Sequence, residues 1–219
     1  MLGLEKQTSL WSSGAMFDDI QYPEIDPNKK NAVQLWDERY QKPEYLFGKE
    51  PSDFLKTFIG SLSKGAALDV AMGEGRNSVF LAEKGFKVEG LDCSAKAIEK
   101  AKKLATEKKV SVDAKVQNLD FYLMPLMKFN TIVMAYYRPA TRFFSELKRG
   151  LVAGGTVLIE GYTVDHFKKN QNNPYLDLDQ CFKPNELLSH LKDLQVLYYK
   201  EMVEGNSHLV YAIAQKNQK

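Results

Sequence analysis

The stretch Leu68-Asp69-Val70-Ala71-Met72-Gly73-Glu74-Gly75-Arg76-Asn77 decides the fold of this chain. The apolar run 66–72, broken only by Asp69, predicts a buried strand, and residues 76–84 predict a helix directly after it. Gly73 and Gly75 permit a sharp turn between them and a close approach of the backbone to a ligand. Ligands of open α/β sheets bind beyond the carboxyl ends of the strands. The stretch therefore predicts a ligand site at a strand–turn–helix unit, although a tight turn without a ligand is the simpler alternative.

Strands and helices alternate after this unit. Further strands are expected at 87–91, 110–116, 131–135 and 156–160, with helices at 94–109 and 143–151. Such alternation predicts right-handed βαβ units and a mainly parallel sheet with helices on both faces. Residues 184–194 predict one more helix, and 196–201 and 208–214 predict two strands joined around Gly205. We therefore expect a seven-stranded α/β sheet that ends in an antiparallel hairpin.

The N-terminal part of the chain differs from this core. Residues 1–30 lack sustained periodicity and are expected to form a tail or loosely attached arm. Trp36 and Tyr40 recur at helical spacing within 31–40, and a second helix is expected after Pro51, which suits the first turn of a helix. We expect one domain over 31–219, with a helical cap or lid at 31–62 and the core at 63–219.

The composition limits the function. The chain has 30 basic and 28 acidic residues, a net charge of +2, which disfavours a dedicated nucleic-acid binder. No apolar run approaches the roughly 20 residues that span a bilayer, so we expect no membrane segment and a cytoplasmic location. The two cysteines, Cys93 and Cys181, argue against a metal cluster, and no metal is expected. The oligomeric state is left open.

Two carboxylates follow the next two predicted strands. Asp92 comes 19 residues after Gly73, where an acidic group can accept hydrogen bonds from ribose hydroxyls. Capping of the following helix, which Ser94 precedes, is the alternative. Asp120 is expected at the end of the third strand, where it can accept a hydrogen bond from an adenine amino group beneath a neighbouring apolar side chain.

The charge of Asp69 distinguishes between two candidate cofactors. A dinucleotide seats its pyrophosphate on the helix that follows the glycine turn, and the spacing Gly73-x-Gly75-x-x-Ser78 tolerates this. A carboxylate at Asp69 would repel that phosphate. S-adenosylmethionine has an ammonium and a sulfonium but no pyrophosphate, so the charge of Asp69 favours the methyl donor.

The chain resembles the class I S-adenosylmethionine-dependent methyltransferases, and more narrowly the tellurite-resistance-type and related small-molecule methyltransferases (methyltransferase domains of types 11, 12 and 25). The resemblance runs from Trp36 to about Lys216 and implies a Rossmann-like fold. It rests on segments 36–40, 45–48, 51–55, 68–77, 90–92, 119–120 and 152–156, the last resembling a Gly-Gly turn before the fifth strand. Ala71 stands where the class often has glycine, and Tyr136-Tyr137-Arg138 replaces the usual segment after strand four.

The resemblance also implies that segment 36–55 covers the methionine end of the donor, while the motif residues above bind the rest of it. The expected donor-binding residues are Trp36, Arg39, Tyr40, Tyr45, Asp69, Ala71, Gly73, Gly75, Asn77, Asp92, Cys93, Ser94, Leu119, Asp120 and Tyr136.

Methyl transfer from a sulfonium is an in-line displacement, in which positioning, exclusion of water and proton removal are the protein's main contributions. The acceptor side is expected to use Tyr136, Tyr137 and Arg138 after strand four, and Glu160, Tyr162 and His166 after strand five. Arg138 can alternatively pair with a surface acid, and His166 can lie in a solvated loop. No catalytic residue is assigned.

The sequence lacks a Pro-Pro-Tyr or Pro-Cys motif after strand four, which disfavours methylation of DNA bases. A small-molecule acceptor, such as a soft sulfur-type nucleophile, fits best. The alternatives are methylation of RNA or protein and a non-catalytic module that binds the donor.

Overall fold

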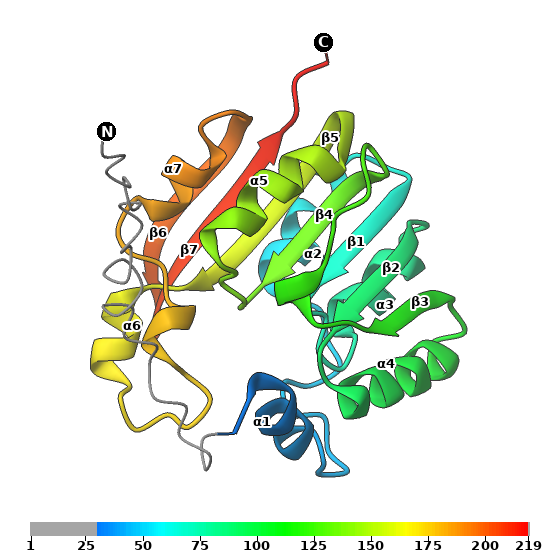
Figure 1. Ribbon diagram of the computed structural model, residues 1–219, viewed down its shortest axis with the longest axis vertical. Helices are drawn as coiled ribbons and strands as arrows, with labels where there is room; N and C mark the ends of the chain where they lie inside the picture. The colour runs from blue at the N-terminus through cyan, green and yellow to red at the C-terminus, as the bar shows by residue number, and fades with distance from the viewer. Residues whose placement is uncertain (1–29, 219) are drawn as a thin grey trace, which may run out of the picture. The chain divides into compact units, whose positions relative to one another are not determined.

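The computed structural model describes residues 30–218, so the expected N-terminal arm lies outside the described residues except for Lys30. The sheet order is β3-β2-β1-β4-β5-β7-β6 (Figure 1). The strands are β1 (Ala66–Val70), β2 (Lys87–Asp92), β3 (Val112–Val116), β4 (Phe129–Ala135), β5 (Leu151–Tyr162), β6 (Gln195–Glu204) and β7 (Ser207–Gln215). Strands β1 to β5 are parallel, and β7 is antiparallel to both β5 and β6. The expected fold class is confirmed.

The helices lie on both faces of this sheet. They are α1 (Ala32–Arg39), α2 (Asp53–Phe58), α3 (Arg76–Glu83), α4 (Ala95–Glu107), α5 (Thr141–Gly150), α6 (Val164–Lys169) and α7 (Glu186–Leu191), with 3-10 turns η1 (Ile59–Ser61), η2 (Leu119–Phe121) and η3 (Leu178–Gln180). Leu55 of α2 and Leu81 of α3 pack on one face of the sheet against Val133 and Leu158. On the other face, the apolar sides of α5 and α7 pack against the remaining core residues of β4 and β5.

The helix starts in the N-terminal part follow from their capping residues. Asn31 accepts a hydrogen bond from the Gln34 N–H, and the Gln34 side chain accepts one from the Asn31 N–H, which forms a capping box. Ser52 caps α2 by accepting from the Leu55 N–H. The predicted helix within 31–40 is confirmed, whereas Pro51 precedes the cap of α2 and is not in its first turn.

Two local expectations were wrong. The Gly-Gly segment does not precede the fifth strand, because β5 already begins at Leu151 and pairs there with Phe129 before its register shifts. Gly154 takes φ 72° within this irregular region, so the glycines make a bulge inside the strand. The alternative that His166 lies in a solvated loop was also wrong, because Val164–Lys169 forms α6.

Within residues 30–218, no helix is both long and apolar enough to cross a membrane.

Candidate functional site

The glycine turn joins β1 to α3 at the carboxyl edge of the sheet. Gly73 (φ 54°) and Gly75 (φ 87°) both adopt left-handed backbone conformations, as glycine permits. A Cβ on Gly73 would lie 3.0 Å from the Tyr40 hydroxyl, and one on Gly75 would lie 2.7 Å from Cβ of Ala101 in α4. The absence of a side chain at Gly73 therefore lets the Tyr40 hydroxyl approach the turn, whereas its absence at Gly75 allows α4 to pack closely.

The Asp92 carboxylate organises the neighbouring strand end. Its Oδ2 accepts a 2.8 Å hydrogen bond from the Gly73 N–H, and its Oδ1 accepts a 2.9 Å bond from the Ser94 N–H. Burial raises the pKa of Asp92. Ser94 itself caps α4 by accepting from the Ala97 N–H. Asp92 thus fixes the turn without being the side-chain cap, and each of its oxygens retains lone-pair capacity for a ligand hydroxyl.

Asp69 is buried on β1 beneath the same turn. Its Oδ2 accepts a 2.6 Å hydrogen bond from the Ser78 hydroxyl of α3. Burial raises the pKa of Asp69 to about 7, so the carboxyl is only partly ionised near neutral pH. Asp69 therefore repels a pyrophosphate less strongly than a fully ionised carboxylate would. A cationic ligand would still favour the ionised form of Asp69.

The residues expected at the adenine end lie partly away from the strand. Because β3 ends at Val116, Asp120 lies in η2 and is exposed, while Leu119 beside it is buried. The expectation that Asp120 ends the third strand was wrong, since the chain continues through a capped 3-10 turn. Tyr137 lies close enough to Asp120 and Asp92 for their charges, together with burial as the main cause, to raise its pKa to about 12.

Cys93 lies between the ribose and adenine ends of the expected donor site. Burial is the main cause that raises the pKa of its thiol to about 12. Cys93 therefore stays protonated at neutral pH and is no thiolate nucleophile.

An aromatic cover, defined here as Trp36, Tyr40, Phe47 and Tyr175, lies over the glycine turn. Trp36 stacks on Tyr40 with ring centroids 5.4 Å apart, Phe47 meets Tyr40 edge-on at 6.4 Å, and Tyr175 meets Phe47 at 6.5 Å. Tyr40 is 5% exposed. Arg39 links the two ends of the cover, because its guanidinium lies over the rings of Trp36 and Tyr175 and donates to the Pro174 carbonyl.

The cover is also tied to the ribose end of the site. Asp37 in α1 accepts a 2.5 Å hydrogen bond from the Ser94 hydroxyl and a 3.2 Å bond from the Lys96 N–H. Figure 1 shows α1 below the carboxyl ends of the central strands. The structure thus brings Trp36, Arg39 and Tyr40 to the predicted site, as the sequence led us to expect.

Tyr45 does not join the cover. Its hydroxyl donates to the Lys100 carbonyl, and its ring packs with Val79, Leu104 and Ala105 on α3 and α4. Tyr45 therefore anchors the segment to the helices. Asn77 is similarly occupied, since its amide oxygen accepts a 2.9 Å hydrogen bond from the Ser52 N–H.

Sequence reasoning missed a buried ion pair beside the turn. Glu74 accepts a 2.6 Å hydrogen bond from the Lys100 ammonium and a 2.7 Å bond from the Leu46 N–H. Its position between two glycines was visible in the sequence, but its partners come from distant segments. Tyr175 was missed because it lies in an irregular stretch without periodicity.

The acceptor side is built where β4 and β5 end. Tyr136 follows Ala135 with φ 56°, an uncommon conformation for a bulky side chain. Its ring lies 5.0 Å from that of Tyr162, and the guanidinium of Arg76 lies 5.8 Å from it. Arg76 also donates a 3.2 Å hydrogen bond to the Phe47 carbonyl, which connects this side to the aromatic cover.

Arg138 is engaged elsewhere. It donates hydrogen bonds of 3.0 and 2.5 Å to Glu186 Oε1 and one of 2.9 Å to the Asp179 carbonyl. The alternative of pairing with an acid is the one the structure shows. The guanidinium is held by α7 and η3 and is not free for an acceptor or a donor carboxylate.

His166 was expected on the acceptor side, with a solvated loop as the alternative, and it is 6% exposed within α6. It stacks on Tyr162 with ring centroids 4.2 Å apart. The His208 N–H donates a 3.3 Å hydrogen bond to its Nδ1, and burial lowers its pKa. A neutral ring that carries its proton on Nε2 satisfies this contact. Nδ1 of His166 thus already accepts a hydrogen bond within the structure.

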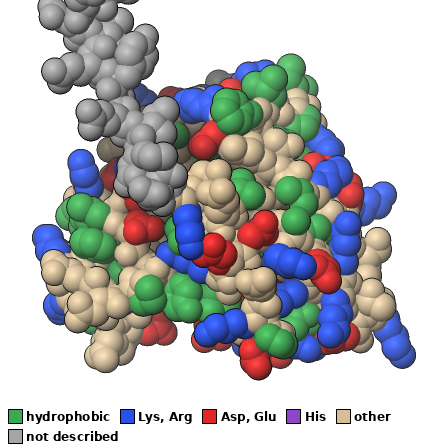
Figure 2. All heavy atoms as spheres, turned by 60° about the horizontal axis from the view of Figure 1, so that its bottom comes forward, with side chains coloured by type: hydrophobic (Ala, Val, Ile, Leu, Met, Phe, Trp, Pro, Cys, Tyr) green, Lys and Arg blue, Asp and Glu red, His purple; other side chains and the backbone are tan. Residues whose placement is uncertain are grey.

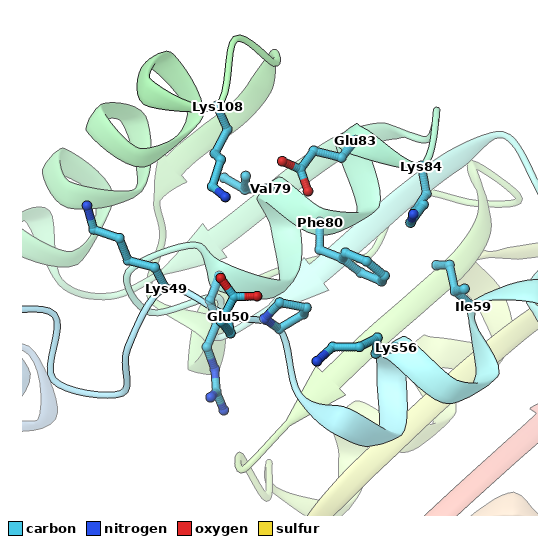
Figure 3. A pocket seen from close by; sticks show the side chains of 11 residues that line it. Lys49, Glu50, Lys56, Ile59, Val79, Phe80, Glu83, Lys84 and Lys108 are labelled. Carbon is cyan, nitrogen blue, oxygen red and sulfur yellow. The ribbon is translucent and has the colours of Figure 1, made fainter.

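A hollow of about 470 Å³ lies between α2 and α3, with Lys49, Lys56, Phe80, Lys84 and Lys108 among the side chains around it (Figure 3). None of the expected donor-binding residues lines it. Two of its lysines are paired, Lys49 with Glu107 at 2.6 Å and Lys56 with Asp53 at 3.2 Å. This hollow is a solvated surface groove, separate from the glycine turn.

Charges of both signs occur together around the site. Figure 2, which brings the lower end of Figure 1 forward, shows acidic and basic side chains interspersed with apolar ones. Across the described range, no group of three His, Cys, Asp or Glu side chains is placed to hold a metal. A cationic nucleoside would suit this site. It consists of the glycine turn at Gly73, the carboxylates of Asp69 and Asp92, and the aromatic rings above them.

Known proteins resemble the chain at two levels. Residues 67–155 match the family model described as "Methyltransferase domain". A search of curated proteins found no match. TehB from Haemophilus influenzae superposes with a TM-score of 0.65 at 18% identity, over 84% of this chain and 68% of that one.

Two further solved structures share this fold. A SAM-dependent methyltransferase from Methanosarcina mazei superposes with a TM-score of 0.59 at 21% identity, over 78% of this chain and 100% of that one. Geranyl diphosphate C-methyltransferase from Streptomyces coelicolor A3(2), in complex with Mg2+, geranyl-S-thiolodiphosphate and S-adenosyl-L-homocysteine, has a TM-score of 0.60 at 15% identity, over 74% of each chain. The match of residues 67–155 to a methyltransferase domain and the fold shared with these structures support an S-adenosylmethionine-dependent methyltransferase of class I.

Proposed function

We propose that the chain transfers a methyl group from S-adenosylmethionine to a small-molecule acceptor held beneath the aromatic cover. The observation that carries this proposal is the continuous chain of rings from Trp36 through Tyr40 and Phe47 to Tyr175 above Gly73. Aromatic walls over the glycine turn suit a compact acceptor and limit the access of water to the reacting groups. The small substrate analogue named with geranyl diphosphate C-methyltransferase supports the same class of acceptor.

The donor site we propose follows the residues that the structure gathers. Asp92 binds the ribose hydroxyls, Leu119 and Asp120 the adenine, and Trp36, Arg39 and Tyr40 close over the methionine end, with Asp69 supplying negative charge below. S-adenosylmethionine, when bound, supplies a methyl group on a positively charged sulfur. We further propose that residues 31–62 act as the cap of a single domain over 31–219 and that the protein works in the cytoplasm. Tyr45, Asn77 and Arg138 are assigned structural roles instead.

Calorimetry with S-adenosylmethionine, S-adenosylhomocysteine, NAD and FAD tests the donor. We expect the first two to bind, and tight NAD binding without a response to the methyl donor would contradict the proposal. A screen of small acceptors, read out by release of S-adenosylhomocysteine, tests the acceptor class. Methylation of bulk RNA or protein that falls steeply with salt would instead assign a macromolecular acceptor. Donor binding without turnover of any acceptor would assign a sensor.

A further inference from the structure

Glu160 is a buried acid that the fold does not fully satisfy. Its side chain is 1% exposed on β5, and no described residue forms a hydrogen bond with its Oε1. The Ser52 hydroxyl hydrogen-bonds the Glu160 carboxyl. A buried polar atom without a partner costs free energy, and native proteins keep few of them. The unpaired oxygen therefore indicates a partner that the chain itself does not provide.

The surroundings of Glu160 come from five elements. The charged groups that act on it are Asp53 of α2, Arg76 of α3 and Asp69 of β1. Three tyrosine hydroxyls also lie close enough for the charge of Glu160 to raise their pKa values, although burial is the larger cause: Tyr136 after β4, Tyr162 on β5 and Tyr211 on β7. One cation, two carboxyls and three tyrosine hydroxyls thus lie around the Glu160 carboxyl.

The sheet register places Glu160 in front of the proposed donor site. Asp69 pairs with Val133, and Val133 pairs with Leu158, so Glu160 lies on the same face two residues nearer the carboxyl edge. With neighbouring strands about 4.8 Å apart and about 3.3 Å per residue, Glu160 lies about 10 Å across the sheet from Asp69 and about 7 Å ahead of it. An acceptor between Glu160 and the glycine turn would face the donor.

We propose that Glu160 Oε1 is the catalytic base that takes a proton from the methyl acceptor, an inference that rests on the function proposed above. The acceptor carries a weakly acidic S–H or O–H group. As the S or O lone pair forms its bond to the methyl carbon, the carbon–sulfonium bond breaks and its electron pair stays on the donor sulfur. The acceptor proton passes to Glu160, and the products are the methylated acceptor, the neutral thioether and a protonated carboxyl.

The other titratable side chains near this edge suit the role less well. His166 already uses Nδ1 to accept from the His208 N–H, and its Nε2 carries the proton. Burial raises the pKa of the Tyr136 hydroxyl, which keeps that group protonated. Burial, as the largest cause, also raises the pKa of Glu160 to about 7, and a general base works best when its pKa lies near the working pH.

The test compares two thiols of different acidity, 4-nitrothiophenol, which is ionised at neutral pH, and benzyl mercaptan, which is largely protonated. Wild-type turnover of benzyl mercaptan should rise with pH through about 7 and then level off. Glu160→Gln should lower that turnover by roughly 100-fold or more, remove the pH-dependent limb, and leave 4-nitrothiophenol little changed. Glu160→Asp should restore part of the lost activity. Glu186→Gln, an acid paired with Arg138, is the matched control and should keep the wild-type turnover of both thiols and the same pH-dependent limb.

Binding of S-adenosylhomocysteine, measured by calorimetry, and the melting temperature separate catalysis from folding. Both should be nearly unchanged in Glu160→Gln, and if that variant does not fold, Glu160→Asp carries the comparison of the two thiols. Equal losses with both thiols, or an unchanged pH limb, would overturn the inference while the proposed function stands. A wild-type protein that binds S-adenosylhomocysteine but methylates neither thiol would also overturn it and leave donor binding intact. A wild-type protein that does not bind S-adenosylhomocysteine would overturn the proposed function itself.

Discussion

Ser78 Oγ donates a 2.6 Å hydrogen bond to Asp69 Oδ2, and this bond joins β1 to α3 directly beneath the glycine turn. The pKa of Asp69 is raised to about 7, chiefly by burial, and the Ser78 hydroxyl is the main group that lowers it, ahead of the charge of Arg76. The acid is thus held in a position where its charge is costly to the free protein.

We predict that Asp69→Asn stabilises the protein at alkaline pH and weakens binding of S-adenosylmethionine. The folded protein binds this proton more tightly than the unfolded chain, so the contribution of Asp69 to stability falls as pH rises from about 4 to about 7. Asparagine has no such pH dependence. Urea unfolding at several pH values should show an advantage of the variant that grows across this interval, and equal curves for both proteins would contradict the prediction.

Asp92→Ala should weaken donor binding by about 10- to 100-fold, because a hydrogen bond to a charged group contributes about 1.5–3 kcal/mol. The structure adds a second cost, since the Gly73 and Ser94 N–H groups lose their acceptor. Ser94→Ala is the control: it removes the cap of α4, for about 1 kcal/mol, and the hydrogen bond to Asp37, but it keeps the carboxylate. Calorimetry and thermal unfolding of both variants separate the effects. If they lose affinity equally, Asp92 only holds the turn.

Tyr175→Ala should speed the dissociation of S-adenosylhomocysteine roughly fivefold with little change in stability. Tyr175 is 39% exposed, and one aromatic pair contributes about 1 kcal/mol. Stopped-flow displacement measures the rate. Leu178→Ala, at a 51% exposed position in the same loop region, is the control and should release the ligand at the wild-type rate. Identical rates for all three proteins would remove Tyr175 from the cover.

Arg138→Ala should lower the unfolding free energy by about 1–3 kcal/mol without changing KM for an acceptor. Burial alone would raise the pKa of Glu186, but hydrogen bonds from Arg138 and the Lys183 N–H hold it below its ordinary value. The pair therefore stabilises the protein above about pH 4, and its contribution fades as pH falls and Glu186 becomes protonated. Urea unfolding at neutral and acidic pH checks this. A raised KM with unchanged stability would return Arg138 to the acceptor site.

The sequence predicted the succession of strands and helices along the core and the glycine turn, because both depend on local patterns. Apolar runs, glycines at turns and the serine caps of α2 and α4 act within a few residues of themselves. The place of Asp92 followed because it lies 19 residues after Gly73, whereas the place of Tyr40 came from the resemblance to the methyltransferases. Gly73 and Gly75 both adopt left-handed backbone conformations, which glycine accepts more readily than other residues.

Long-range partners were beyond the reach of the sequence. His166 is polar and flanked by lysines, yet it is buried because β7 and Tyr162 close over it. Arg138 meets Glu186 across 48 residues of chain. Tyr45 turns towards α4 because a backbone carbonyl there accepts its hydroxyl. Each of these contacts joins two distant segments, and the sequence of one segment does not indicate the other.

The position of β7 between β5 and β6 also constrains the order in which the chain can assemble. β6 leaves the ribosome before β7 but has no direct pairing with β5, so it must wait for β7 before it can join the sheet. Until then β5, with the bulge at Gly154, is an open edge that can recruit other strands. Closing the segment between Tyr162 and Ser207 is a non-local step and is expected to be slow. During synthesis, the half of the molecule that includes Glu160 is thus the last to become protected from aggregation.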